Sequence, residues 1–513
     1  MSNQAPKLQR VLAALARRGL EVTREGSVWS IRTQHDPEGV TAEVLLPDGF
    51  PLSRKAAEQL ARFASASHPE GGRTLAARAT PDFHAGAHVP VGAVVATSPD
   101  MLVPEAIGTD INCGMRLHVV DLGLDRFMSR KAQLIADLRG DLLLGTRDLP
   151  MRSAALAALY RAGAPAWLEA QDDPLGRMAM ADREQIEAEL GRCYELGSFE
   201  GSDAWLSTGD RDVVRDPCLG TPGGGNHFVE LQVVEAVLDG ATAHAWGVRV
   251  GQLAFMVHSG SRSVGVAVGE HWRRRARELW PEGLAHPRKS PPTGGTTCGR
   301  KPPTDPLRSR SERTAAKRPP AAHTELAAGG LNSQVFTVHG EAAQEYLRAM
   351  STAANYAAVN RLLLAELVRL RLREHFGELA CPLIWDGPHN LVSREHDCLV
   401  HRKGATPARL GEPVLIPGSM GQPSYLLVGL GCERWLESAS HGAGRALTRH
   451  RARQLDDDAA GLAQIECIAL HAERLREEAP AAYKAIDPVI DVQVEAGIVA
   501  PVARLRPLLT FKA

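Results

Sequence analysis

Glycine-rich turns lie at the ends of several β-like segments in this chain. This pattern favours a fold in which rigid strands position the residues of the adjoining loops. Glycine dominates 220–225, and the apolar segment that follows predicts a strand over 228–237. A second predicted strand, over 248–257, ends beside His258 and the Gly260 turn. Such strand–turn junctions are where binding and catalytic residues commonly lie.

Helical and β-like segments alternate along the rest of the chain. Hydrophobic periodicity and composition predict helices over 8–19, 53–65, much of 128–200, 341–374 and from 445 onward. Strand- and turn-like composition marks 22–32, 76–122 and 383–430. The first 45 residues combine one helix with one strand, and we interpret 1–45 as a small N-terminal appendage without chemistry of its own.

Composition favours a globular protein of a reducing compartment. The 513 residues include 59 lysines and arginines against 60 aspartates and glutamates, so any nucleic-acid contact must come from local patches. The 8 cysteines are scattered without a CxxC pair, which argues against a disulfide framework. We see neither a signal peptide nor an apolar run of membrane-spanning length, so we expect a cytoplasmic protein that does not bind membranes.

One stretch, 286–322, differs in kind from the rest. Proline and glycine pairs recur in it, and 9 basic residues stand against Asp305 and Glu312. So few of its residues can be buried that we predict a disordered insertion. It is either a tolerated surface insertion or a mobile basic arm that contacts phosphates, and its deletion should leave folding intact.

A candidate metal constellation begins in a glycine-framed turn, where Asp110 and Cys113 stand three residues apart. That spacing can aim a carboxylate and a thiolate at one point, although such a pair alone is more often a cap and a buried thiol. His227, His258 and His389 each lie where a β-like segment meets a glycine turn. Imidazole, carboxylate and thiolate together suit one or two divalent transition metals, but the distance in sequence leaves their convergence open.

A further glycine-framed histidine, His441, is followed by three small residues and then by a predicted helix. Small residues let a ligand approach the backbone, and amides at the start of a helix can hold a phosphate. The loop 417–421 is also built from small residues, and Ser424 follows it. Neither stretch is a Walker loop or a dinucleotide fingerprint, and each alone is weak evidence.

These blocks occur in the order found in the RtcB family of tRNA-splicing RNA ligases, which the chain resembles over about residues 45–513. The six main blocks are 108–116, 223–230, 258–262, 389–390, 417–421 and 440–445, and the stretches 81–86, 402–405 and 480–484 also resemble family blocks. Six blocks in one order are far more specific than any one of them. A departure occurs at Gly86-Ala87-His88, where the family usually has a second glycine.

The resemblance implies a single large catalytic domain of α/β (α+β) class over 46–513. Its core would be β-sandwich-like and wrapped by helices, and the 286–322 insertion would interrupt it.

The resemblance also implies a metal site. Asp110, Cys113, His227, His258 and His389 would bind two manganese ions. Cys113 would bridge them, with Asp110 and His227 on one ion and His258 and His389 on the other.

His441 would be the catalytic histidine that becomes guanylylated, and Tyr483 would stack near the guanine. The residues implied to line the nucleotide site are Asn226, His227, Phe228, Val229, Glu230, His389, Asn390, Pro417, Gly418, Ser419, Met420, Ser424, His441, Gly442, Ala443, Gly444 and Lys512.

The implied reaction uses GTP and Mn²⁺. His441 attacks the α-phosphorus of GTP, the GMP passes to an RNA 3′-phosphate, and an RNA 5′-hydroxyl then displaces it. Ends that carry a 2′,3′-cyclic phosphate would first be opened by hydrolysis. The expected partners are GTP and RNA with such ends, in tRNA splicing or RNA repair, with archease as a candidate helper. We expect a monomer, and the sequence leaves the cellular RNA open.

Two other functions stay open at this point. A metal-dependent phosphohydrolase would use the same ligands without nucleotidyl transfer, but it gives no role to His441. A non-catalytic RNA-repair scaffold would suit the basic insertion, but the near-neutral charge and the complete ligand set argue against it. A covalent adduct formed with GTP and Mn²⁺ would distinguish the ligase from both.

Overall fold

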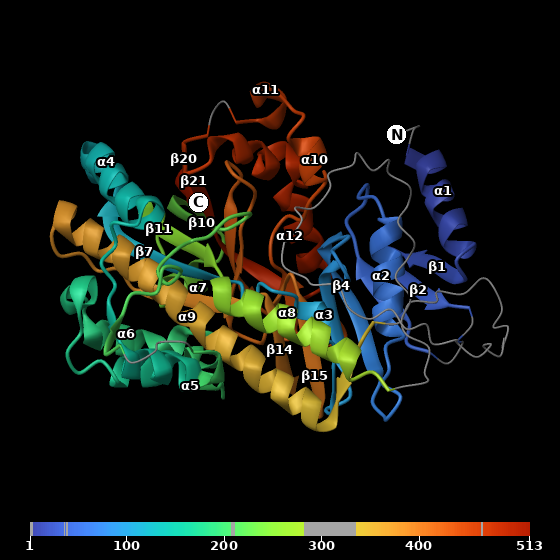
Figure 1. Ribbon diagram of the computed structural model, residues 1–513. Helices are drawn as coiled ribbons and strands as arrows, with labels where there is room; N and C mark the ends of the chain where they lie inside the picture. The colour runs from blue at the N-terminus through green and yellow to red at the C-terminus, as the bar shows by residue number, and fades with distance from the viewer. Residues whose placement is uncertain (1–3, 35, 37–38, 207–210, 282–334, 463–464) are drawn as a thin grey trace, which may run out of the picture.

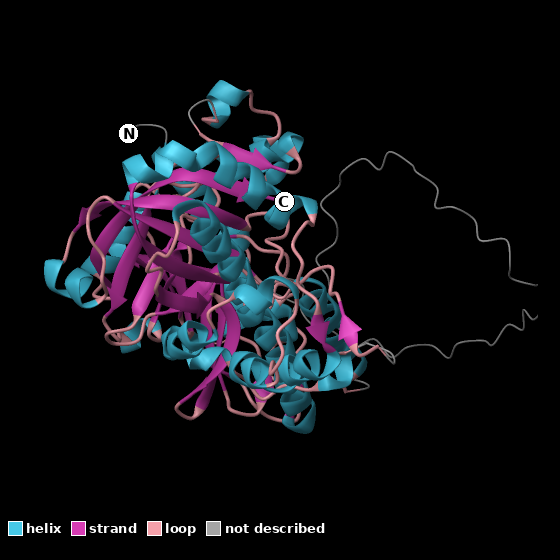
Figure 2. Ribbon diagram, turned by 90° about the vertical axis from the view of Figure 1, so that its left-hand side faces the viewer, coloured by secondary structure: helices cyan, strands magenta, loops and turns pink. Residues whose placement is uncertain are grey.

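The computed structural model describes residues 4–34, 36, 39–206, 211–281, 335–462 and 465–513. The predicted insertion at 286–322 lies outside these residues. Two large sheets form the centre of the described structure, and helices lie around them (Figure 1). Figure 2 shows the helices on several sides of the packed strands.

The first sheet has seven strands and takes most of them from the N-terminal part of the chain. In spatial order they are β1 (Leu20–Glu25), β2 (Val28–Thr33), β3 (Ala42–Leu45), β4 (Thr74–His84), β5 (Val91–Thr97), β15 (Cys398–Lys403) and β14 (Asn390–Glu395). Neighbouring strands are antiparallel except β3 and β4, which are parallel. The single strand predicted over 22–32 is a hairpin instead, because the chain turns at Gly26, whose φ is +57°.

Two helices pack against this sheet through a shared apolar cluster. They are α1 (Gln4–Ala16) and α2 (Arg54–Ala64), which agree with the helices predicted over 8–19 and 53–65. The hydroxyl of Ser53 accepts a hydrogen bond from the Ala56 amide at 3.3 Å and so caps the start of α2. The first 45 residues therefore share a core with later ones, and their status as an appendage stays a prediction.

The second sheet has eight strands and is curled like a barrel. In spatial order they are β13 (Leu383–Pro388), β7 (Gly114–Gly123), β11 (Gln252–Ser259), β10 (Phe228–Val237), β21 (Val499–Lys512), β18 (Ser424–Gly429) and β17 (Pro413–Ile416), and β20 (Cys467–Ala469) also pairs with β21. The edge strands β13 and β17 contact each other, so the sheet is nearly closed. Apolar side chains such as Leu117, Met256 and Leu505 form one buried cluster of this sheet. The mixed α/β class is thus confirmed, whereas the barrel-like closure was not expected.

Three pairs of short strands complete the strand set of the described chain. They are β6 (Met101–Leu102) with β12 (Val338–His339), β16 (Ala405–Pro407) with β19 (Ser438–Ser440), and β8 (Met151–Arg152) with β9 (Val213–Val214).

One long helix, α9 (Gly340–Phe376), covers 37 residues. It packs against α4 (Leu124–Arg139), α5 (Ser153–Glu169), α8 (Arg262–Glu278) and the strands β7 and β11, and Figure 1 shows α8 and α9 side by side. The remaining α-helices of the described chain are α3 (Pro104–Ile107), α6 (Arg183–Glu189), α7 (Gly240–Ala245), α10 (Arg449–Ala452), α11 (Asp457–Ala460) and α12 (Ile486–Glu495). Within the described ranges, none of the helices combines the length and the apolar character needed to cross a membrane.

The end of the chain differs from the helical prediction for residues after 445. Short helices do occur there, but the last segment forms β21, a strand in the middle of the eight-stranded sheet. The sequence did not predict this strand because it contains Pro501 and Pro507. Proline has no amide hydrogen to donate to a sheet ladder, so it argues against a central strand. Both lie at register shifts, where β21 pairs with β18 and β10, so they sit at points where the regular ladder is already interrupted.

Candidate active site

The register of the eight-stranded sheet brings together residues that are remote in sequence. Strands β13, β7, β11 and β10 are adjacent and antiparallel, so the starts of β7 and β10 lie beside the ends of β13 and β11. Cys113 directly precedes β7, and His227 directly precedes β10. His258 is the penultimate residue of β11, opposite Phe228, and His389 directly follows β13. Four predicted ligands therefore meet at one end of the sheet.

Cys113 lies at the centre of this cluster. Its Sγ is 3.2 Å from Nε2 of His227 and 3.1 Å from Nε2 of His258. Oδ2 of Asp110 lies 3.0 Å from Nε2 of His227, and Nε2 of His389 lies 3.3 Å from Nε2 of His258. The five side chains thus form two groups that share Cys113, each with its ligand atoms within 4.8 Å of one another. This donor set fits two divalent transition ions with a bridging thiolate, an assignment that stays a prediction.

Backbone groups orient the ligands. Nδ1 of His258 donates to the carbonyl of Asn226 at 3.1 Å, which directs Nε2 toward the cluster. The side chain of Asn390 donates from Nδ2 to the carbonyl of Asp110 at 3.1 Å and accepts at Oδ1 from the Gly404 amide at 2.8 Å. Asn390 therefore ties the turn that carries Asp110 to the segment that follows β15.

Burial sets the charge states of the cluster. It lowers the pKa of His258 and of His389 well below 6.5, so both imidazoles are neutral, as metal ligands must be. Burial alone would raise the pKa of Asp110, but its interaction and hydrogen bond with the adjacent His227 outweigh this effect and lower the pKa. Burial and the nearby Asp110 raise the pKa of Cys113, so a thiolate there requires a compensating cation, which a bound metal ion would supply.

His441 stands beside the metal cluster, just after β19. Its ring centroid is 4.8 Å from that of His389. Its Nδ1 is hydrogen-bonded to Oδ2 of Asp82 at 2.5 Å, and the other carboxylate oxygen accepts from the Thr80 hydroxyl at 2.6 Å. Nε2 of His441 has no hydrogen-bond partner among the residues that the structure describes, so it is the nitrogen available to a ligand.

Asp82 is a site residue that sequence reasoning missed. The 81–86 block drew attention to it, but its partner His441 is 359 residues away, so no spacing could link the two. Burial alone would raise the pKa of Asp82, but its interaction with the adjacent His441 and the hydrogen bonds from His441 and the Thr80 hydroxyl lower it, so the group is a carboxylate. Gly444 lies directly against it: its φ is +75°, and a Cβ there would be 2.3 Å from the Asp82 carbonyl oxygen.

The loop 417–421 and the turn after His441 lie close together, as the predicted nucleotide site requires. A Cβ added at Gly442 would be 3.5 Å from the carbonyl oxygen of Pro417. The hydroxyls of Ser419 and Ser440 are buried without a hydrogen-bond partner in the described part of the chain. Unpartnered buried hydroxyls suggest a ligand with oxygen acceptors, such as a phosphate.

Glu230 lies on β10 in a defined set of hydrogen bonds. It accepts from the Thr510 hydroxyl at 2.6 Å and from Nε2 of Gln232 at 2.7 Å. Nε2 of Gln232 also donates to the hydroxyl of Ser424 at 2.9 Å, so two predicted nucleotide residues share one network. Burial raises the pKa of the Glu230 carboxyl.

Lys512 approaches the same strand from β21. Its Nζ donates to the carbonyl of His227 at 3.1 Å and lies 6.0 Å from the ring centroid of Phe228. A cavity of about 330 Å³ adjoins it, lined by Gly225, Arg449, Arg453, Ala469, His471, Arg474, Leu475, Glu477, Glu478, Lys512 and Ala513.

Two predicted nucleotide contacts are placed differently from the rest. The side chain of Val229 points to the other face of β10, where it packs in the core with Phe511, so only its backbone can reach a ligand. The ring of Tyr483 is covered by the Arg445 guanidinium at 5.1 Å, and its hydroxyl contacts Glu478.

Comparison with known proteins gives one family and several relatives. The family model described as tRNA-splicing ligase RtcB matches residues 59–513. The RNA-splicing ligase RtcB of Mycobacterium tuberculosis is 33% identical over 477 residues, which cover 85% of this chain and 96% of the relative. The tRNA-splicing ligase RtcB of Archaeoglobus fulgidus is 30% identical over 519 residues, which cover 92% of this chain and 95% of the relative.

Proposed function

Since this chain belongs to the RtcB family and is an RNA ligase, we propose that it uses GTP and Mn²⁺ to join RNA 3′-phosphate or 2′,3′-cyclic phosphate ends to 5′-hydroxyl ends through a guanylylated His441. The observation that carries the proposal is the position of His441 between the buried Asp82 carboxylate and His389 of the metal cluster. The role is tRNA splicing or RNA repair.

The hydrogen bond to Asp82 prepares His441 as a nucleophile. An imidazole attacks phosphorus only through an unprotonated ring nitrogen. Because the carboxylate accepts from Nδ1–H, the neutral ring carries its lone pair on Nε2. When Nε2 bonds to the α-phosphorus of GTP and pyrophosphate leaves, the ring becomes positive, and the charge of Asp82 stabilises it.

The five clustered side chains would hold the manganese ions. Asp110, Cys113 and His227 form one group, and Cys113, His258 and His389 form the other. Bound Mn²⁺ neutralises charge on phosphate oxygens. These side chains would hold the ions beside His441, because the ring of His389 lies next to His258 on one side and next to His441 on the other.

The residues around Glu230 would bind the guanosine. Guanine presents N1–H and N2–H₂ as adjacent donors, and a carboxylate can accept from both. Thr510 and Gln232 hold that carboxylate in place from the protein side. The unpartnered hydroxyl of Ser419 is suited to a phosphate oxygen.

Two transfers then complete ligation. The GMP on His441 passes to an RNA 3′-phosphate, the N–P bond breaks, and the imidazole is regenerated. The 5′-hydroxyl of the second RNA attacks the activated 3′-phosphate, and GMP leaves as a 3′,5′-phosphodiester forms.

The decisive experiment is formation of the covalent adduct without RNA. Protein incubated with α-phosphate-labelled GTP and Mn²⁺ should acquire a label that is labile in acid and stable in alkali, as a histidine phosphoramidate is. His441→Ala should abolish the label, whereas His450→Ala, a change at an exposed histidine of α10, should retain it. Peptide mapping that places GMP on Lys403, Lys484 or Lys512 would refute the mechanism, and absence of any label would favour the phosphohydrolase or the scaffold.

A further inference from the structure

Arg361 is a buried side chain of α9 whose guanidinium makes four hydrogen bonds, none of them within its own helix. Nε and Nη2 donate to Oδ1 of Asp386 at 2.9 and 2.6 Å. Nη1 donates to the carbonyl of Asn112 at 2.6 Å and to the carbonyl of Ser259 at 3.2 Å. One side chain thus contacts three separate segments.

Each of these segments carries a residue of the metal cluster. Asn112 directly precedes Cys113, and Ser259 directly follows His258. Asp386 lies on β13, three residues before His389. The guanidinium therefore connects the three segments that bear the group Cys113, His258 and His389.

The turn that contains Asn112 is held in place by several contacts besides the hydrogen bond from Arg361. Asn112 has a φ of +51°, a conformation that needs support from its surroundings. Its Nδ2 donates to the carbonyl of Ala354 on α9 at 2.7 Å, and its amide donates to the carbonyl of Asn390 at 2.7 Å. At Gly114, a Cβ would lie 3.0 Å from Cζ and Nη1 of Arg361, so the guanidinium sits directly against the strand start.

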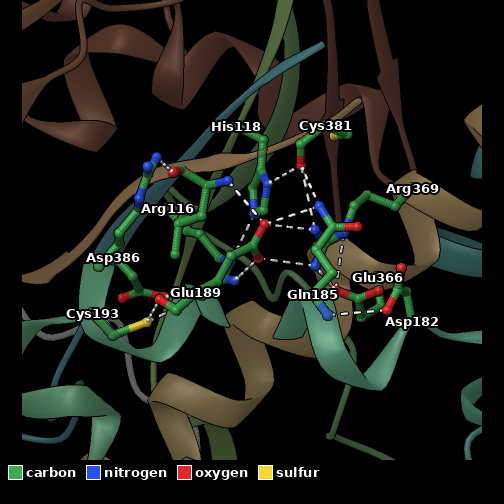
Figure 3. A network of polar contacts seen from close by, with 12 residues as sticks. Arg116, His118, Asp182, Gln185, Glu189, Cys193, Glu366, Arg369, Cys381 and Asp386 are labelled. Carbon is green, nitrogen blue, oxygen red and sulfur yellow. Dashed lines mark hydrogen bonds and ion pairs between the residues drawn. The ribbon is translucent and has the colours of Figure 1, made fainter. Parts of the chain in front are cut away.

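The carboxylate that holds Arg361 is itself fixed from the other side. Oδ2 of Asp386 accepts from Nη1 of Arg116 on β7 at 3.2 Å. Figure 3 shows this pair within a buried polar network that continues through Glu189 to Arg369. The Asp386 carboxylate is therefore held between two buried guanidinium groups, those of Arg361 and Arg116.

We propose that Arg361 is a positioning residue that sets the spacing of Cys113, His258 and His389 and thereby the affinity of the site for Mn²⁺. The inference rests on the metal site of the proposed function. A guanidinium can bind one carboxylate and two carbonyls at once because its donors are fixed in a planar fork. Lysine carries the same charge but only one nitrogen, so Arg361→Lys keeps the charge and loses most of these contacts.

The test is Mn²⁺ binding by the metal-free protein, followed through the electron paramagnetic resonance signal of the free ion. Arg361→Lys should weaken binding by about 10- to 100-fold, the usual effect of removing a group that orients metal ligands. GMP adduct formation should then require correspondingly more Mn²⁺ and recover when Mn²⁺ is saturating. Asp386→Asn, which weakens the anchor while keeping the side-chain shape, should shift binding in the same direction and serves if Arg361→Lys does not fold.

Arg369→Lys is the matched control. Arg369 is also a buried arginine of α9, but it donates to Glu189, Glu366 and the Cys381 carbonyl and contacts none of the metal-bearing segments. The Mn²⁺ affinity of the Arg369→Lys variant should equal that of the wild type. Unchanged binding in Arg361→Lys, or an equal loss in both variants, would overturn the inference.

The same titration separates this inference from the proposed function. A wild type that binds no Mn²⁺ refutes the metal assignment and this inference with it. A wild type that binds Mn²⁺ but forms no adduct refutes the role of His441, while a selective loss in Arg361→Lys still supports the positioning role.

Discussion

Replacing Asp82 by asparagine removes the charge that faces His441 and changes the side-chain volume very little. One carboxylate oxygen accepts from the Thr80 hydroxyl and the other from Nδ1 of His441. If the asparagine keeps its oxygen toward Thr80, its NH₂ faces Nδ1. The ring must then present a lone pair at Nδ1 and carry its proton on Nε2, the nitrogen that the mechanism needs unprotonated.

The size of the effect follows from these contacts. A hydrogen bond to a charged group contributes about 1.5–3 kcal/mol. Loss of that contribution from the transition state alone slows adduct formation by about 10- to 150-fold. The tautomer change adds to this, up to about 10⁴-fold, the loss seen when the aspartate of a Ser-His-Asp triad becomes asparagine.

The assay is the single-turnover rate of GMP adduct formation at saturating GTP and Mn²⁺. Asp82→Asn should be slow while its Mn²⁺ binding stays normal, because Asp82 is not in either metal group. Asp48→Asn, a change at a side chain that is 89% exposed, is the control and should react like the wild type. A normal adduct rate in Asp82→Asn would refute the reasoning that this carboxylate selects the tautomer of His441.

Three further predictions concern the metal, the base and the pH dependence of stability. Cys113→Ala should lose Mn²⁺ and ligation together, because it removes the thiolate shared by both groups; metal analysis that finds full occupancy would exclude Cys113 from the site. Glu230→Ala should lose the preference for GTP over ATP in adduct formation, a discrimination of up to about 10⁴–10⁵ in sites built on hydrogen bonds, and an unchanged preference would make Lys512 the next candidate. Burial lowers the pKa of Lys484 to about 8 from 10.5, so the unfolded chain binds more protons between these pH values and stability rises with pH there. Lys484→Met should remove this increase in the free energy of unfolding, which is worth about 3 kcal/mol. Denaturant unfolding measured across this pH range would contradict the prediction if the free energy rose equally with pH in both proteins.

Local pattern was enough to predict much of the fold. The strand β10 has the bounds that its apolar run predicted, and α2 begins after its Ser53 cap. Long-range geometry was out of reach, because the meeting of Cys113, His227 and His258 depends on the order and register of strands far apart in sequence. The pairing of Asp82 with His441 is of the same kind.

The candidate site shows the same division between local and long-range information. The sequence located the glycine turns and the histidines within them, and the structure brings the five predicted ligands into two groups around Cys113. Their roles toward metal and nucleotide remain predictions. Arg361 gave no signal in the sequence, because an arginine in a long helix is ordinarily solvent-exposed. Its burial and its contacts with Asn112, Ser259 and Asp386 arise only in the folded chain.

The length of α9 has a consequence for how a chain of this kind can vary. Each residue of an α-helix advances the direction of its side chain by about 100°. A single insertion between Gly340 and Arg361 would therefore turn the guanidinium away from Asn112, Ser259 and Asp386 at once, although the helix itself would still form. The number of residues that precede Arg361 in α9 is therefore constrained by the metal cluster, even where the exposed side chains of the helix are free to change.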